Sequence, residues 1–258
     1  MEKIKSILKN FKSIQLKEMD SVALMHRTDE KYTVNINDIF NILQLLFKTY
    51  KCLEIDNERL FNYKTEYLDD NEFNLYKNHQ NGKLNRYKIR FRDYIQSKLT
   101  FLEIKFKSNK GLTQKKRIKV PFESRNGSPV CNQFIVTNTP YNPNKFDIKL
   151  KNSFDRITLV NLTTKERVTI DINLKFRNNE SSKDLSELGI IEVKREKGSR
   201  KSEILSILKN NRIKPTSFSK YTIGSVLLNP KLKYNKFKKK LLFINKNSAN
   251  GNIWDTSF

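Results

Sequence analysis

Five segments of this chain alternate between apolar residues and polar residues, and most of the charges among the polar residues are positive. In the first segment the alternating cations are Arg86, Lys88, Arg90 and Arg92, and the other segments cover 102–107, 115–120, 167–173 and 191–194. A β-strand places residues i, i+2 and i+4 on one face, so each segment predicts a strand with one apolar and one charged face. Like charges aligned on a sheet repel, and we therefore expect a polyanion in front of this basic face.

The rest of the chain predicts helices between the strands. Apolar spacing and capping residues predict helices over 2–19, about 38–50, 71–79, about 199–211 and 217–228. Strands are expected at 21–34, 50–56, 59–69, 85–95, 99–107, 114–121, 147–162, 166–176 and 187–196. Residues 121–146 are rich in Pro, Asn and Ser, which leaves a short helix and a mobile loop as alternatives. The pattern favours an α+β fold with a closed antiparallel β-barrel, flanked by helices.

We expect one domain over residues 1–229, with the amphipathic N-terminal helix 2–19 packed on it rather than on a membrane surface. Residues 230–258, which include the run Lys236–Lys240, are expected to form a basic tail with weak contact to anionic surfaces. Cys52 and Cys131 have no metal-ligand or disulfide spacing, as is usual in a reducing compartment. The sequence shows no signal peptide and no transmembrane segment, so we expect a soluble, cytoplasmic protein.

The formal net charge of +24 indicates an anionic partner, which could be nucleic acid, an anionic membrane or a phosphate-rich small molecule. Part of this charge is expected to be ordinary solvated surface, because Lys, Asn and Ile are all abundant. Nucleic acid is the weaker alternative, since Tyr87 and Phe91 lie on the face opposite the cations and stacking platforms are missing there. The placement of cations on strands favours phosphates instead.

A sheet with charged residues inside must neutralise them, because each buried charge costs several kcal/mol. Water, interior carboxylates or a bound polyphosphate would do so. Arg offers bidentate phosphate contacts and Lys a point charge, and together they suit a chain of phosphates. Glu103 and Glu192 lie on the same faces and are the ligands that a hard divalent cation prefers.

Several motifs together resemble the VTC domain, the polyphosphate polymerase module of the CYTH-like, or triphosphate tunnel metalloenzyme, superfamily. They are Arg27-Thr-Asp-Glu-Lys31-Tyr32, Tyr67-Leu-Asp69, His79-x-x-Gly82 with the four cations after it, Leu102-Glu103-Ile-Lys105, Lys115-x-Arg117, Asp155-Arg156, Arg167-Val-Thr-Ile-Asp171, Ile191-Glu192-Val-Lys194 and Phe218-Ser219-Lys220-Tyr221. The resemblance covers about residues 20–228. It implies a tunnel-shaped antiparallel barrel and a divalent-metal-dependent transfer of a nucleotide γ-phosphate to a growing polyphosphate chain.

The resemblance also implies site residues. The basic phosphate-binding and catalytic positions are Lys31, Arg90, Arg92, Lys105, Lys115, Arg156, Arg167 and Lys220, and Arg117 and Lys194 are added as substrate-binding residues. Glu192 falls at the metal-binding glutamate, and Glu103 is either a second metal ligand or an ion-pair partner. Two roles are likewise left open for Asp171, which either pairs with interior arginines or helps to hold a metal. Mn²⁺ or Mg²⁺ is the implied cofactor.

One departure bears on the choice within the superfamily. Its wider membership has Glu-x-Glu-x-Lys in the first strand, whereas here Arg27, Asp29 and Lys31 have that spacing. This agrees with the VTC branch rather than with a hydrolase whose metal is held entirely by carboxylates. The expected function is therefore a polyphosphate polymerase that uses a nucleoside triphosphate, in the first place ATP. The alternatives are a tripolyphosphatase or nucleoside triphosphatase of the same fold, and a non-catalytic module that binds polyphosphate or nucleic acid.

Overall fold

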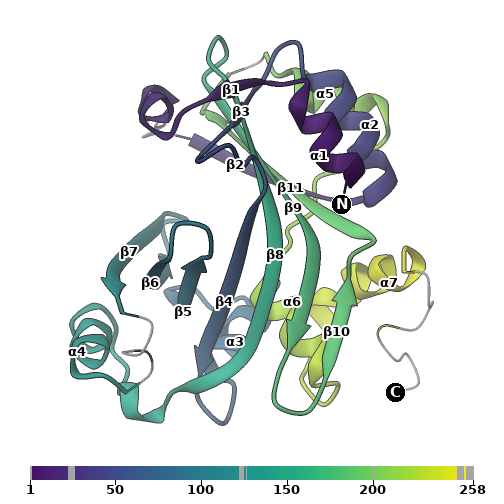
Figure 1. The fold of residues 1–258 in the computed structure, drawn as a ribbon. Coiled ribbons are helices and arrows are strands. Elements are labelled where there is room, and N and C mark those ends of the chain that lie inside the picture. The colour runs from purple at the N-terminus through teal and green to yellow at the C-terminus, as the bar shows by residue number, and fades with distance from the viewer. Residues whose placement is uncertain are drawn as a thin grey trace. The chain divides into compact units, whose positions relative to one another are not determined.

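The computed structural model of this chain describes residues 2–22, 27–121, 125, 127–199, 201–248 and 253. The strands in these ranges are β1 (Lys12–Ile14), β2 (Arg27–Asn35), β3 (Lys51–Leu53), β4 (Phe61–Asp69), β5 (Arg86–Tyr94), β6 (Leu99–Lys107), β7 (Thr113–Val120), β8 (Asp147–Asn161), β9 (Glu166–Arg177), β10 (Ser182–Leu185) and β11 (Leu188–Glu196). The helices are α1 (Glu2–Lys9), α2 (Ile36–Leu46), α3 (Asn74–Gln80), α4 (Pro129–Asn138), α5 (Glu203–Asn210), α6 (Lys220–Leu228) and α7 (Lys238–Lys246) (Figure 1). Short 3₁₀ turns include η1 (Leu16–Val22), η3 (Pro143–Lys145) and η4 (Asn235–Phe237).

The strands belong to one large, mainly antiparallel sheet. Its hydrogen-bonded order is β2-β11-β9-β8-β4-β5-β6-β7, while β1 pairs in parallel with β3, β3 also pairs with β8, and β10 pairs with β9. In the described part of the chain no hydrogen-bonded pairing joins the two ends of this order, β2 and β7. The mixed helix and sheet architecture is confirmed, and closure into a barrel stays a prediction.

The chain divides into two compact units, which are described separately. Unit 1 comprises Met1–Phe61, Phe154–Leu174 and Leu185–Phe218, and unit 2 comprises Asn62–Ser153, Lys175–Asp184 and Ser219–Phe258. Strands β8 and β9 contribute residues to both units.

In unit 1 the apolar face of the sheet is covered by helices. Helices α1, α2 and α5 lie together over one side of the unit 1 strands (Figure 1). Ile39, Ile42, Leu43 and Leu46 form the buried stripe of α2, and they join a core that includes the alternate apolar residues of β9 and β11. Burying each such side chain contributes about 1.5–3 kcal/mol. The predicted arrangement, with apolar residues facing helices and charges on the other face, is confirmed here.

The approach of α2 to the sheet requires a glycine. A Cβ added to Gly189 of β11 would lie 2.1 Å from Cδ1 of Ile39 and 3.2 Å from the carbonyl oxygen of Asp171. A side chain at this position would force Cδ1 of Ile39 to move and would crowd the backbone of β9, so glycine allows α2 to pack closely on β11 here.

In unit 2 the strands β4 to β7 are consecutive antiparallel neighbours. Ile89, Phe91, Leu102 and Ile104 are buried on the face opposite the cations. Helix α3 packs against α6, where the rings of Tyr76 and Tyr221 meet edge to face at 6.4 Å. The segment 121–146 contains α4, capped by the Ser128 hydroxyl, so the helical alternative for this segment is the one observed.

The prediction of one helix over 2–19 was wrong in its extent. Helix α1 ends at Lys9, and the chain continues as β1 and η1. The Arg59 guanidinium binds backbone carbonyl groups at the C-terminal end of α1. Its Nη1 donates to the carbonyl oxygens of Leu8 at 2.5 Å and Phe11 at 2.8 Å. The parallel pairing of β1 with β3 then fixes the chain as a strand.

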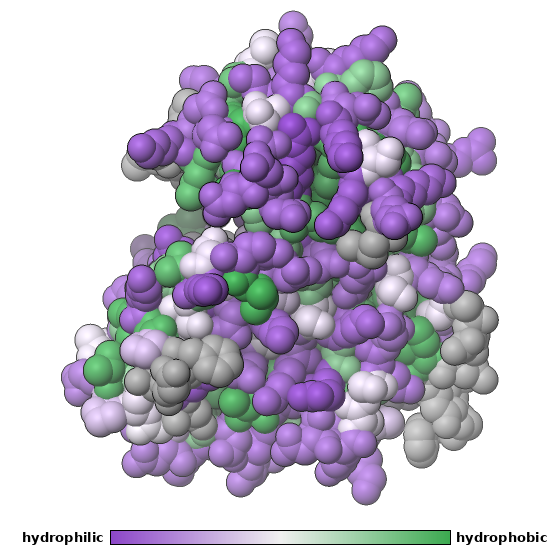
Figure 2. Space-filling model, viewed as in Figure 1, coloured by the Kyte–Doolittle hydropathy of each residue, from purple (hydrophilic) through white to green (hydrophobic). Residues whose placement is uncertain are grey.

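The predicted tail also contains ordered structure. Residues 230–248 include η4 and α7, and Phe237, Leu241 and Ile244 are buried. The domain boundary at residue 229 stays a prediction. Hydrophilic side chains cover most of the face shown in Figure 2, as expected for a chain with 51 Lys and Arg residues. In the part of the chain that the structure describes, every helix is too short or too polar to cross a membrane.

Candidate functional site

In unit 1, four neighbouring strands present charged side chains on one face of the sheet. The register pairs Lys31 with Glu192, and it pairs Lys194 with Asp29 on one side and Arg167 on the other. Directly paired residues of antiparallel strands point to the same face, so these side chains gather there because of the period-two pattern of the sequence. This unit 1 basic face consists of Asp29 and Lys31 from β2, Glu192 and Lys194 from β11, Arg167 and Asp171 from β9, and Arg156 from β8.

Glu192 lies between two lysines. Its Oε2 is 2.7 Å from Nζ of Lys31, and its Oε1 is 3.3 Å from Nζ of Lys194. Burial raises the pKa of this carboxyl, but Lys31 and Lys194 outweigh burial and hold the pKa well below its usual range. Glu192 is therefore an ionised carboxylate at neutral pH.

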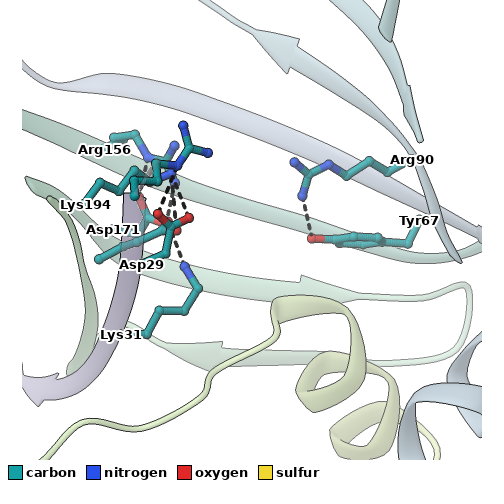
Figure 3. Close-up of polar contacts among 9 residues, drawn as sticks. Asp29, Lys31, Tyr67, Arg90, Arg156, Asp171 and Lys194 are labelled. Carbon is teal, nitrogen blue, oxygen red and sulfur yellow. Dashed lines mark hydrogen bonds and ion pairs between the residues drawn. The ribbon is translucent and has the colours of Figure 1, made fainter. Parts of the chain in front are cut away.

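Arg156 and Asp171 form a bidentate pair. Nε of Arg156 donates to Oδ1 of Asp171 at 2.6 Å and Nη2 donates to Oδ2 at 2.8 Å. Figure 3 shows Arg156 and Asp171 pointing toward one another, with Lys31, Lys194 and Asp29 beside them. Since Asp171 is only 3 % exposed and both its oxygens face this guanidinium, it matches the ion-pair alternative rather than a metal ligand.

Arg167 differs from the other cations of this face. Its side chain is half-buried, and among the described residues it makes no hydrogen bond or ion pair. Its pKa is lowered, first by burial and then by the charges of Arg27 and Arg156. The charges of Glu192 and Asp29 raise it and offset part of this effect. A partly desolvated cation without a partner is costly, and an anionic ligand would relieve that cost.

In unit 2, three strands present a second set of cations on one face. The register pairs Arg90 with Glu103 and Glu103 with Arg117, and it pairs Lys105 with both Lys88 and Lys115. We call this the unit 2 basic face, made of Lys88, Arg90 and Arg92 from β5, Glu103 and Lys105 from β6, and Lys115 and Arg117 from β7.

Glu103 is the centre of this face. It is fully buried, and its Oε2 accepts from Nε of Arg90 at 2.8 Å and from Nη2 at 2.7 Å, while Nη1 of Arg92 lies 3.9 Å away. Oε1 forms an ion pair with Lys115. Burial raises the pKa of Glu103, but Arg90, Arg92 and Lys115 together depress it far below its usual range. One carboxylate thus orients three cations and leaves the group with an excess of positive charge.

Aromatic rings lie on the unit 2 basic face, contrary to the sequence prediction. The guanidinium of Arg90 is 5.8 Å from the centre of the Tyr67 ring, and that of Arg117 is 4.6 Å from Phe101. These rings come from β4 and β6, the neighbours of the strands that supply the arginines. The alternation Tyr63, Thr65, Tyr67 in β4 was the signal, but only the strand pairing places it beside Arg90.

A buried network of hydrogen bonds and stacked rings holds Arg90 in place. Its Nη1 donates to the hydroxyl of Tyr67 at 3.3 Å (Figure 3), and the Tyr67 ring stacks on Tyr221 at 5.0 Å. The Tyr221 hydroxyl donates to Asp69, which also accepts from the backbone amides of Leu75 and Tyr76 at 2.9 Å each. Asp69 therefore joins β4, the start of α3 and α6.

Lys220 is the first residue of α6, directly after the Ser219 cap. The Ser219 hydroxyl accepts from the backbone amide of Thr222 at 3.3 Å and from Nζ of Lys88 at 2.9 Å. This contact ties the helix start, where the backbone dipole favours anions, to the unit 2 basic face.

The predicted site residues thus fall into two groups. Unit 1 brings together Lys31, Arg156, Arg167, Glu192 and Lys194, and unit 2 brings together Arg90, Arg92, Glu103, Lys105, Lys115 and Arg117, with Lys220 at the start of α6 in the same unit. Sequence analysis missed Lys88 as a contact of the α6 cap, and it missed Tyr67 as the partner of Arg90.

The carboxylates fit a divalent metal in only one of these groups. Among the described residues, no cluster of three or more His, Cys, Asp or Glu side chains is found. Cations face both oxygens of Glu103 and of Glu192, but Glu103 is fully buried and shared by three of them, so a divalent ion there would add charge to an excess of like charge. Glu192 is partly exposed, and Oδ2 of Asp29 lies 4.0 Å from the same Lys194 that contacts it. Mg²⁺ is commonly held by one or two carboxylates plus substrate phosphates, and Glu192 fits that kind of site.

Comparison with known proteins identifies the family. The model of the VTC domain matches residues 26–229. Among solved structures, a Hippeastrum protein whose description reports a dominant triphosphatase activity is similar with a TM-score of 0.51 and 13 % identity, over 81 % of this chain and 98 % of that one. A Vibrio parahaemolyticus protein described as an adenylate cyclase matches with a TM-score of 0.44 and 7 % identity, over 76 % of this chain and 95 % of that one. Among curated proteins no match is found.

The likeness to the Hippeastrum protein shows a shared fold. The family match is the stronger result, because it spans most of the chain and includes every residue assigned to the two basic faces. The resemblance indicated by the sequence motifs is thereby confirmed, and the chain belongs to the VTC domain family.

Proposed function

We propose that this protein is a polyphosphate polymerase, an enzyme that transfers the γ-phosphate of a nucleoside triphosphate, in the first place ATP, to a growing polyphosphate chain. The observation that supports it most is the excess of preoriented cations over carboxylates on both basic faces. On the unit 2 face Arg90, Arg92 and Lys115 share the single buried carboxylate of Glu103. On the unit 1 face Arg167 has no partner among the described residues.

Phosphoryl transfer needs little covalent help from a protein, because positioning and electrostatic stabilisation supply most of the rate. Lys31, Arg156, Arg167 and Lys194 would bind and orient phosphates on the unit 1 face. Arg90, Arg92, Lys105, Lys115, Arg117 and Lys220 would do so on the unit 2 face. Cations fixed in place before the reaction can disperse the charge that develops on the transferring group without reorganising.

Glu192 is the residue that we assign to a divalent metal, Mg²⁺ or Mn²⁺. When bound, the metal would neutralise charge on the phosphate oxygens and help align them. Glu192 would hold it with one carboxylate, while Lys31 and Lys194 on either side keep that carboxylate ionised. We assign Glu103 to positioning Arg90, Arg92 and Lys115 instead.

A triphosphatase is the second candidate. The specific support is the Hippeastrum protein, which shares the fold and is described as having a dominant triphosphatase activity. The two functions differ in the acceptor, a phosphate oxygen of the chain or a water molecule. A binding module without turnover is the third candidate.

Analysis of products by length separates these functions. Purified protein is incubated with ATP and Mn²⁺ or Mg²⁺, and the products are resolved on a gel. The proposal predicts long phosphate chains that appear as ADP is released. Orthophosphate without chains would instead establish a triphosphatase, and binding of polyphosphate without release of ADP in either metal would establish a binding module.

A further inference from the structure

The C-terminal segment is anchored on α3 by specific contacts. The Tyr76 hydroxyl donates to the carbonyl oxygen of Lys233 at 2.8 Å. The Gln80 side chain, oriented with its oxygen toward the segment, accepts from the backbone amides of Asn235 at 3.2 Å and Lys236 at 3.1 Å. Since Tyr76 and Gln80 are both buried, residues 233–236 are held against the helix rather than free of it.

An aromatic contact completes this attachment. Phe237 is only 3 % exposed, and its ring meets Tyr76 at 6.1 Å and His79 at 6.0 Å, in both cases edge to face. Leu241 and Ile244 of α7 are also buried. The segment therefore has a fixed orientation, which determines which of its lysines lie near α3 and β5.

Lys236 and Lys240 are turned toward α3 and β5. Nζ of Lys236 lies 2.8 Å from the position that a Cβ would occupy on Gly82, in the turn between α3 and β5. Lys240 is half-buried, with Nζ 5.7 Å from the centre of the Phe237 ring. Burial lowers the pKa of Lys240, and the charge of Lys236 lowers it further, as expected for two cations close together. Lys238 and Lys239, between them in sequence, are exposed.

The first residues of β5 add two more cations at the same place. Nη1 of Arg86 donates to the carbonyl oxygen of Lys83, next to Gly82, at 3.0 Å. Lys88 is held by the Ser219 hydroxyl at 2.9 Å. Arg86, Lys88, Lys236 and Lys240 all act on His79, whose pKa is lowered to about 2, first by burial and then by these four charges. His79 is neutral at pH 7, so it adds no fifth charge.

This group of cations continues the unit 2 basic face. Arg86 and Lys88 lie on the same face of β5 as Arg90 and Arg92, and the register pairs them with Lys107 and Lys105 of β6. From Arg92 to Arg86 the strand rises by about 20 Å, which is longer than the three phosphates of a nucleotide extend. A linear chain of phosphates could follow such a row of cations.

We propose that Arg86, Lys88, Lys236 and Lys240 form a distal binding site for a linear inorganic polyphosphate chain, beyond the residues assigned to the triphosphate. The site rests on the proposed function for its ligand, and it gives the C-terminal segment a role in chain binding. A single-stranded nucleic acid is the less suited polyanion, because stacking needs exposed rings and Phe237 beside these cations is buried.

The test compares two double variants that remove the same charge. In Lys236→Ala/Lys240→Ala the two cations of the distal site are lost, and in Lys238→Ala/Lys239→Ala two exposed lysines of the same segment are lost. Binding of long-chain polyphosphate and of tripolyphosphate is measured by competition with a labelled chain. The first variant should bind long-chain polyphosphate about tenfold more weakly, with tripolyphosphate affinity within about twofold of wild type. The second should stay within about twofold for both ligands.

Three outcomes would overturn the distal site. The two double variants could lose affinity for long-chain polyphosphate equally, as expected for a solvated basic tail. Alternatively, neither variant could lose affinity for it. In Lys236→Ala/Lys240→Ala the affinity for tripolyphosphate could fall as much as the affinity for long-chain polyphosphate. The four cations would then belong to the triphosphate site already described. Single-stranded RNA of matched charge serves as a third ligand, and a loss of RNA affinity equal to the loss of polyphosphate affinity would contradict the assignment to polyphosphate.

A measurement of thermal unfolding keeps the result interpretable. Thermal unfolding reports whether Lys240→Ala disturbs the packing of Phe237, and if it does, the single variant Lys236→Gln replaces the double one, because Lys236 is exposed. The binding test needs no turnover. A lack of chain synthesis from ATP would therefore defeat the proposed function alone, while unchanged chain binding in the Lys236 variants would defeat the distal site alone.

Discussion

At the scale of single residues, the two basic faces differ in how their cations are neutralised. On the unit 2 face Glu103 is fully buried and contacts Arg90, Arg92 and Lys115. On the unit 1 face Arg156 is fully paired with Asp171, whereas Arg167 has no partner in the described part of the chain. On the unit 2 face the buried carboxylate of Glu103 stabilises the cations without a ligand. On the unit 1 face Arg167 is left for an anionic ligand. Substitutions at these residues should therefore have opposite effects on stability.

Glu103→Gln should destabilise the protein by about 3 kcal/mol at pH 7, because it removes the one carboxylate that compensates three cations. Glu103 has a depressed pKa in the folded state, so its contribution is complete above the ordinary value of 4.5 and declines as the pH falls below it. The difference between wild type and variant should shrink over that range. Urea unfolding at pH 7 and at lower pH measures both effects, with the exposed Glu58→Gln as control. A loss of less than about 0.5 kcal/mol at pH 7 would contradict the central role of Glu103.

Arg167→Ala should leave the unliganded protein as stable as wild type or more stable, because a half-buried cation without a partner is removed. It should weaken tripolyphosphate binding about 30-fold, the loss expected for a charge-assisted hydrogen bond. Thermal unfolding without ligand and calorimetric titration with tripolyphosphate give the two values. Arg177→Ala, at an exposed position of the same strand, should change neither. Reduced stability together with unchanged binding would show that Arg167 is structural.

Glu192→Ala should abolish metal-dependent turnover while the protein stays folded and still binds phosphate. The carboxylate is the one that fits a metal, and its removal leaves Lys31 and Lys194 available to phosphate oxygens. Product formation from ATP is measured over a range of Mn²⁺ and Mg²⁺ concentrations, with Asp147→Ala at an exposed site as control. Metal dependence equal to that of wild type would refute the assignment.

At the scale of elements, α6 connects a buried network to the unit 2 basic face. Its cap Ser219 contacts Lys88, and Tyr221, two residues later, contacts Asp69 and the ring of Tyr67, which lies against Arg90. Helix α5 in unit 1 has the same kind of cap, Ser202, whose hydroxyl accepts from the backbone amide of Leu205 at 3.3 Å and which is not among the residues of the unit 1 basic face. Substitutions at these two caps can therefore separate the effect of a cap on helix stability from its effect on anion binding.

Ser219→Ala and Ser202→Ala should each lose about 1 kcal/mol of stability, the usual effect of removing an N-cap hydroxyl. Only Ser219→Ala should also weaken binding of long-chain polyphosphate, because it frees Lys88, a residue of the distal site, from its fixed position. Unfolding and titration of both variants provide the comparison. Equal loss of affinity in both would mean that the cap does not position the basic face.

The sequence was a good guide to these elements wherever the period was clear. Strands β5, β6, β7, β9 and β11 lie where the alternation placed them, and in all of these except the mostly exposed β7 one buried face fixes the register of the strand. It was a poor guide where a distant contact decides the backbone, as with Arg59 at the end of α1. The aromatic rings beside the arginines were missed for the same reason, since they come from neighbouring strands.

At the scale of the whole molecule, the family assignment and the mixed helix and sheet architecture agree with the prediction from sequence, and closure of the barrel stays a prediction. The site residues were predicted as one list, and the structure sorts them into the basic faces of two units with different chemistry. The role of Glu103 could not be predicted from sequence, because a carboxylate among cations suits both a metal and an ion pair. Only its burial and its contacts favour the second role.

The most direct test of this account is a crystal structure of the protein with tripolyphosphate and Mn²⁺. We predict phosphate oxygens within hydrogen-bonding distance of Arg167 on the unit 1 basic face, and the metal at the carboxylate of Glu192. Phosphate bound only to outer surfaces, with both basic faces empty or the metal at Glu103, would contradict the account.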